Sequence, residues 1–432
     1  MKKQTVSATS MKSFYLIWLG QAISLFGSAI VQFALIWWLT QETGSATVLA
    51  TASLVGLLPP VLLGPFVGVL VDRWSRRLTL LFADGLVALA TIVLAYLFWI
   101  DMIATWHVFA LLFVRALGGA FHYPAFHAST ALMVPEEKLT RIQGINQILE
   151  GSLSIVAAPL GAILLGILPM QGVLGIDVGT AVFAMLPLLF LVIPQPKKQA
   201  ATSAGTASFW TEMRAGFRYV RAWPGLMLLM LLAMLVNLML TPSSALMPLL
   251  VTDHFGGDAL QLSFLESAFG IGIVAGGIGL SVWGGFNRRI LTTIGGLIGL
   301  GAGFLLIGLA AANAFWVAVA GAFFAGGMIA MVNGPVRAIM QSVIAPEMQG
   351  RVLSLLISLA SAMSPIGLMI AGPAADLLGI QFWFVFAGVI TSLVGVVGFF
   401  MPPLIHIEDG RSPNKAPDIA NPELLGTDSV SA

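Results

Sequence analysis

Long apolar runs, separated by short polar or charged turns, account for nearly the whole sequence. Twelve such runs can be bounded, and each is long enough, at about 1.5 Å per helical residue, to cross a hydrocarbon core of about 30 Å. They lie at residues 14–40, 47–71, 78–100, 105–133, 140–168, 170–193, 225–252, 260–284, 290–311, 315–343, 350–377 and 381–401. The pattern therefore predicts an all-α membrane protein with twelve transmembrane helices.

Composition supports a polytopic membrane protein. Of the 432 residues, 58% are hydrophobic and 9% are charged, whereas soluble domains carry about 25% charged residues. The sequence contains no cysteine, which excludes disulfides, thiolate metal sites and cysteine nucleophiles. The first apolar run is too long for the hydrophobic region of a signal peptide, so it is predicted to remain as a membrane span.

The chain divides into two similar halves. Pro124 and Pro135 recur as Pro335 and Pro346 at an offset of 211 residues, and a pair of arginines at 76–77 recurs at 288–289. Two six-helix repeats in the same orientation are therefore predicted, related by an axis along the membrane normal. The predicted organisation is an N-terminal six-helix bundle at 1–193, a cytoplasmic linker at 194–223, a C-terminal bundle at 224–402 and a disordered cytoplasmic tail at 403–432.

The linker contains a basic amphipathic segment at 208–223. Its apolar residues recur at helical spacing and its arginines lie elsewhere around the helix, which predicts a helix on the inner membrane face. A calmodulin-like or nucleic-acid partner is the less favoured interpretation, because the segment joins two membrane-embedded halves.

Basic residues set the topology. Of the 20 Lys and Arg residues, Arg115 and Arg337 lie well inside a predicted span, Arg141 and Arg351 lie one residue inside the inner end of a span, and the others lie in the two tails, the linker and one set of loops. The positive-inside rule therefore predicts that both termini are cytoplasmic.

One charged loop stands out from this apolar pattern, between the second and third spans. Gly68, Asp72, Arg73, Arg76 and Arg77 occupy five positions of a ten-residue stretch. A glycine allows close helix approach, and a carboxylate at a helix end can accept hydrogen bonds from the N-terminal amides of another helix. The loop is predicted to take part in conformational change, and a static, topology-setting role is the alternative.

This stretch resembles the G-x-x-x-D-R-x-x-R-R signature between helices two and three of the major facilitator superfamily. Further stretches resemble bacterial macrolide-efflux-type permeases: residues 18–24, Leu58-Pro59, Gly64-Pro65, residues 115–125, residues 134–137 and Gly350-Arg351-Val352. The resemblance implies the two-repeat architecture, a monomer in a bacterial cytoplasmic membrane, and proton-coupled drug export without a cofactor. It also implies that Asp72 meets helix N-terminal amides near residues 349–351.

Charges inside spans are costly and are therefore candidates for function. Arg115 lies about ten residues into the fourth span, and Glu150 about ten residues into the fifth. We expect the two to neutralise each other, either as a proton-binding site or as a static ion pair. His122, two turns beyond Arg115, is a second titratable candidate, with hydrogen-bonded packing as its alternative.

Three other carboxylates lie within spans. Glu266 and Asp177 are six or seven residues from the predicted outer face, and each is either a further proton-coupling group or a helix-end carboxylate reached by outer water. Asp84 is expected to pair with the arginines of the signature loop.

The first and seventh spans carry amides among bulky apolar groups, which suits a large amphipathic organic molecule better than a sugar or an ion. The candidate path residues are Gln21, Gln32, Phe33, Trp37, Met234 and Asn237. Packing or lipid contact is the alternative for each of them.

These observations favour a proton-coupled secondary transporter that exports an amphipathic compound, for which a macrolide-like antibiotic is a candidate, by alternating access. Export of an endogenous metabolite, such as a siderophore or lipid precursor, is the first alternative. A membrane-embedded enzyme is a distant one, because the sequence holds no G-x-S-x-G, H-E-x-x-H or G-x-x-x-x-G-K motif. The expected partners are the substrate, protons and the bilayer, and no nucleic acid.

Overall fold

The computed structural model describes residues 8–191, 193 and 209–409. Its helices are α1 (Ala8–Thr43), α2 (Ala46–Arg73), α3 (Arg76–Trp99), α4 (Thr105–Met133), α5 (Glu136–Ile167), α6 (Met170–Phe190), α7 (Phe209–Arg221), α8 (Pro224–Leu249), η1 (Leu250–His254), α9 (Ala259–Trp283), α10 (Arg289–Leu309), α11 (Phe315–Val343), α12 (Pro346–Leu378), α13 (Ile380–Phe399), α14 (Pro402–Ile405) and η2 (Ile407–Asp409). Within these residues, 12 helices are long and apolar enough to cross a membrane. The predicted fold class is confirmed.

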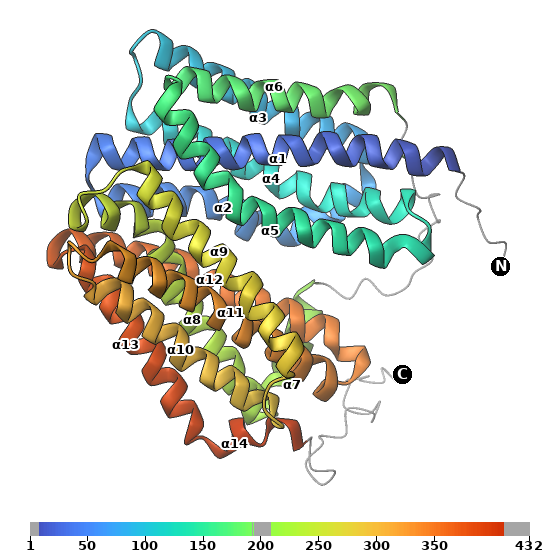
Figure 1. Cartoon of the computed structure of the whole chain (residues 1–432). Helices are drawn as coiled ribbons and strands as arrows, with labels where there is room; N and C mark the ends of the chain where they lie inside the picture. Colours follow the sequence, from blue (N-terminus) through green and yellow to red (C-terminus); the bar gives the residue numbers. More distant parts are fainter. Residues whose placement is uncertain (1–7, 192, 194–208, 410–432) are drawn as a thin grey trace, which may run out of the picture.

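Two helical bundles make up the molecule. The first contains α1 to α6 and the second α8 to α13, and they contact each other mainly through α2 against α12 and α5 against α9. Figure 1 shows the bundles side by side at one end and diverging towards the other, where the start of α1, α7 and α14 lie. We call these the closed end and the divergent end.

A carboxylate joins the bundles at the closed end. Asp376, near the end of α12, accepts hydrogen bonds from the backbone amides of Ala46 (2.7 Å) and Thr47 (3.0 Å) at the start of α2. It also accepts from the hydroxyls of Ser45 (3.2 Å) and Thr47 (2.6 Å). The first amides of a helix have no partner within the helix, so a residue of the second half caps a helix of the first.

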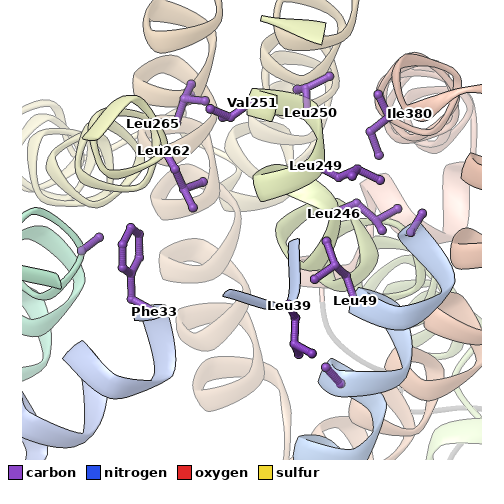
Figure 2. Close-up of a cluster of buried hydrophobic side chains, with 14 of the residues drawn as sticks. Phe33, Leu39, Leu49, Leu246, Leu249, Leu250, Val251, Leu262, Leu265 and Ile380 are labelled. Carbon is purple, nitrogen blue, oxygen red and sulfur yellow. The ribbon is translucent and has the colours of Figure 1, made fainter. Parts of the chain in front are cut away.

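An apolar plug lies beside this cap. Figure 2 shows side chains from both bundles converging there, and the plug is defined by Phe33, Leu39, Leu49, Leu246, Leu249, Leu250, Val251, Leu262, Leu265 and Ile380. All of them are less than 9% exposed. Because the plug offers no polar group to water or ions, it seals the closed end between the bundles.

The segments between and after the bundles differ in part from the prediction. The amphipathic linker helix is present as α7, and it packs on α12, where the backbone of Arg351 lies against Gly216. The tail predicted to be disordered from residue 403 begins with ordered turns, since Leu404 and Ile407 are fully buried against the second bundle. Residues 194–208 and 410–432 lie outside the described part of the chain.

Candidate functional site

Among the cavities in the described part of the chain, three are lined by candidate residues. The first, about 600 Å³, lies in the first bundle between α1, α2, α3 and α4. The second, about 420 Å³, lies between the bundles, lined by α1, α2 and α5 on one side and α8 and α9 on the other. Ala29, Gln32, Ser53 and Leu153 line both, so the two adjoin. A third, about 470 Å³, lies in the second bundle and is lined by Arg337 and Asn237.

Three polar side chains meet in the wall of the first cavity. The amide nitrogen of Gln21 donates to a carboxylate oxygen of Asp84 at 2.9 Å, and the amide oxygen of Gln21 lies 2.5 Å from Nε2 of His122. The same Nε2 lies 3.4 Å from the other carboxylate oxygen of Asp84. Gln21 is 1% exposed and Asp84 8%. We call Gln21, Asp84 and His122 the histidine layer.

A second polar cluster lies behind the same cavity. A guanidinium nitrogen of Arg115 lies 2.5 Å from a carboxylate oxygen of Asp177. The other oxygen of Asp177 accepts from the hydroxyl of Ser28 at 2.9 Å, and Thr91 donates to the first at 3.2 Å. Arg115 also donates to the backbone oxygen of Ser28 at 3.0 Å. We call Ser28, Thr91, Arg115 and Asp177 the arginine layer.

The two layers have related positions on the same three helices. α1 contributes Gln21 and Ser28, α3 contributes Asp84 and Thr91, and α4 contributes His122 and Arg115. Each pair is seven residues apart, which is two helical turns, or about 10.5 Å. The spacing places both layers on the inward faces of these helices, and it is a signal that sequence reasoning missed.

The electrostatics of the layers differ. In the arginine layer a cation and an anion are paired, and three further hydrogen bonds satisfy both groups, so the charge is already balanced. In the histidine layer a carboxylate faces a neutral amide and an imidazole, which carries charge only when protonated. Among the described residues, Asp84 therefore contacts Gln21 and His122 and has no permanently charged partner, unlike Asp177.

Two expectations about these charges are wrong, and one of the two alternatives for Asp177 is excluded. Arg115 pairs with Asp177 and not with Glu150, whose side chain is exposed. Asp177 is 1% exposed, so it is not a helix-end carboxylate reached by water. Asp84 bonds to Gln21 and lies beside His122 rather than pairing with loop arginines. The sequence placed each of these residues within a span, but it did not fix the direction in which the side chain points.

The signature loop is described in part. Arg77 donates to the backbone oxygens of Leu188 and Leu189 at the end of α6, each at 2.5 Å, so it binds the carboxyl end of a helix in its own bundle. Arg76 is 5% exposed. Gly68 lies within α2; the side chains of Asp72 and Arg73 lie outside the described part.

Four of the candidate path residues line cavities. Gln21 lines the first, Gln32 the first and second, Phe33 the second and Asn237 the third. Two do not line any of the three: Trp37 packs against the buried apolar cluster, and Met234 is partly buried on α8. Glu266 lines the second cavity, between the bundles.

Comparison with known proteins gives a family match over most of the chain. Residues 17–357 and 241–426 match the model described as Major Facilitator Superfamily. The chain is 36% identical over 384 residues to "Macrolide efflux protein A" of Streptococcus pyogenes, covering 89% of this chain and 94% of that protein. It is 27% identical over 404 residues to "Multidrug efflux pump Tap" of Mycolicibacterium fortuitum, covering 90% and 95%.

Solved structures share the fold at low identity. A bacterial homologue of the human lysosomal transporter Spinster, in an inward-facing and unoccupied conformation, has a TM-score of 0.67 at 13% identity, covering 94% of this chain and 99% of that chain. A POT family transporter in complex with 5-aminolevulinic acid has a TM-score of 0.68 at 15% identity, covering 91% and 96%.

Proposed function

Because the chain belongs to the major facilitator superfamily, as a macrolide-efflux-type permease, we propose that it exports amphipathic organic compounds, macrolide-like antibiotics among them, in exchange for protons. The family makes it a multi-pass transporter of the bacterial membrane and not an enzyme. The observation that supports the proposal is the histidine layer, in which a carboxylate, an imidazole and an amide meet in the wall of a cavity of about 600 Å³.

Alternating access accounts for the two unlike ends. With both termini cytoplasmic, as the distribution of basic residues favours, the closed end faces outwards and the divergent end inwards. The described arrangement is then an inward-facing state, held by the Asp376 cap and the plug. Export requires the opposite state, in which the plug separates and the divergent end closes.

The signature loop is the proposed counterpart of the Asp376 cap. α2 and α12 pack together and run in opposite directions, so the end of α2 with Asp72 faces the start of α12, just as the end of α12 with Asp376 faces the start of α2. We assign Asp72 to capping α12 near residues 349–351 in the outward-facing state. The two carboxylates would then act in alternate states, and Asp72→Asn should impair transport while leaving expression intact.

Proton binding is assigned to His122 and Asp84. A proton taken up by the imidazole gives an imidazolium, whose charge the carboxylate of Asp84 neutralises at the 3.4 Å separation. The other charged groups near this pair are Arg115 and Asp177, which neutralise each other two turns away. Among the residues lining the first cavity, Asp84, His122 and Arg115 are those that can carry charge.

Export of an endogenous metabolite is the alternative, since the same cavities would accept one. Accumulation of a fluorescent or radiolabelled macrolide in cells with and without the protein separates the two. The proposal predicts lower accumulation with the protein, reversed by a protonophore. If cells with and without the protein accumulate every drug of an amphipathic panel equally, export of an endogenous substrate is favoured.

A further inference from the structure

Glu266 lies in a cavity that the proposed proton site does not use. It is partly buried on α9, and it lines the second cavity together with residues of both bundles. Among the described residues, no hydrogen bond or ion pair engages its side chain. The carboxylates of the histidine layer and the arginine layer are already engaged: Asp84 bonds to Gln21, and Asp177 pairs with Arg115.

The surroundings of Glu266 supply no positive charge. The other residues lining this cavity are alanines, other apolar residues, serines, a threonine and one glutamine, so Glu266 is its charged group. α8 and α9 contain no Lys or Arg. On α5, the basic residues Lys138 and Arg141 lie close to the start of the helix, far from Leu153 and Ser154, which line the cavity.

A carboxylate in this position is costly without a counter-ion. Moving an ionised group out of water requires a compensating charge or hydrogen bonds. The described part of the chain provides neither a counter-charge nor hydrogen bonds for the Glu266 carboxylate. A positively charged ligand could therefore be attracted by this carboxylate without displacing an existing ion pair.

The walls fit the remainder of such a ligand. Phe33, Ile36, Pro248 and Leu262 give an apolar surface, while Gln32 adds a hydrogen-bonding amide. Phe33 and Leu262 also belong to the plug (Figure 2), so a bound molecule would lie directly against the seal of the closed end. The cavity adjoins the first one, which gives space for a molecule larger than its own 420 Å³.

We propose that Glu266 binds the ammonium group of a cationic amphipathic substrate in the cavity between the bundles. This inference rests on the proposed export function and deepens it by naming the charge of the substrate and the residue that recognises it. The apolar walls hold the body of the substrate, and α9 contributes the charge from the second bundle. Binding therefore places one molecule in contact with both bundles at the seal that must open.

A pair of matched probes tests the inference. One is a fluorescent amphiphile ending in a trimethylammonium group, and the other is the same molecule ending in an uncharged tert-butyl group of the same shape. Binding is measured on the purified full-length protein in nanodiscs at mildly alkaline pH. A permanent charge is used because it cannot lose a proton, so binding of the cation is separated from proton transfer.

The wild type is expected to bind the cation more tightly than the neutral probe. Glu266→Gln should weaken binding of the cationic probe about tenfold or more, which corresponds to a loss of about 1.4 kcal/mol of binding free energy. It should leave binding of the neutral probe unchanged. Glu266→Asp should retain much of the preference, and Glu150→Gln, which removes an exposed carboxylate outside the three cavities, should retain all of it.

Two results would overturn the inference: no preference of the wild type for the cation, or unchanged cation binding in Glu266→Gln. Transport of the same probes separates failure of the site from failure of the function. If the Glu266→Gln variant exports the neutral probe, the proposed export function stands even when the binding data contradict a cation site at Glu266. A wild type that binds the cation through Glu266 but exports neither probe would leave the site standing and contradict the export function.

Discussion

The carboxylate of Asp376 accepts a hydrogen bond from the backbone amide of Ala46, 2.7 Å away, across the boundary between the two bundles. Three further hydrogen bonds from Ser45 and Thr47 converge on the same carboxylate. A helix of one half is thus capped by a residue of the other, and separating the halves at this end breaks all four bonds at once.

Replacing Asp376 should open the closed end. Asp376→Asn keeps the size of the side chain but removes the charge that favours the helix N-terminus, and loss of an N-cap costs about 1 kcal/mol. The outward-open population should rise about fivefold. Because the sequence has no cysteine, an introduced cysteine at Ala50, which is 3% exposed, reports opening through its rate of labelling by a membrane-impermeant maleimide.

The control for this variant is Glu42→Gln in the same cysteine background. Glu42 is exposed near the same end of the molecule, so its loss changes local charge without removing the cap. Labelling that is equally fast in the Asp376 variant and in the control would show that the cap does not hold the closed end.

The arginine layer should behave as scaffold. Arg115→Met leaves Asp177, which is 1% exposed, as a buried charge without its cation, and breaking such a pair costs about 3–5 kcal/mol. The melting temperature of the purified protein should fall clearly. The double variant Arg115→Met, Asp177→Leu should recover much of it, because no buried charge remains. An unchanged melting temperature in the single variant would contradict the structural role.

Close contact between α9 and α11 depends on glycine. A Cβ atom on Gly276 would lie 2.6 Å from the Cα of Gly327, whereas one on Gly277 would meet nothing within 4 Å. Gly276→Ala should therefore destabilise the second bundle by about 1–3 kcal/mol through overpacking. Gly277→Ala, the next residue on the same helix, should be neutral in the same thermal unfolding measurement. Equal melting temperatures for the two variants would argue against this crossing.

The number and order of the spans could be predicted from the sequence, because apolar length and basic loops are strong, local signals. The twelve predicted runs correspond to α1–α6, α8 with η1, and α9–α13. The start of the C-terminal tail could not be predicted as ordered, because the burial of Leu404 and Ile407 depends on contacts with distant helices.

The site was predicted less well, for a geometric reason. Arg115 and Glu150 each lie about ten residues into consecutive predicted spans, which made Glu150 the expected partner, whereas Asp177 was expected near the outer face. Which face of each helix points inwards is set by packing between helices that are not neighbours in the sequence. The seven-residue spacing that relates Gln21 to Ser28 and Asp84 to Thr91 carried this information, but only once the three helices were known to be adjacent.

Coupling of drug export to protons bound at the histidine layer can be measured directly. Proton and macrolide fluxes are followed together in proteoliposomes with an imposed pH gradient, for the wild type, Asp84→Asn and the control Glu150→Gln. Opposite drug and proton fluxes are expected in the wild type and the control. In Asp84→Asn both gradient-driven fluxes should be lost, while drug exchange without a gradient should persist, because an amide beside a neutral imidazole has the same zero net charge as the protonated histidine layer. Drug transport without proton movement in the wild type, or full coupling in Asp84→Asn, would contradict proton binding at this layer.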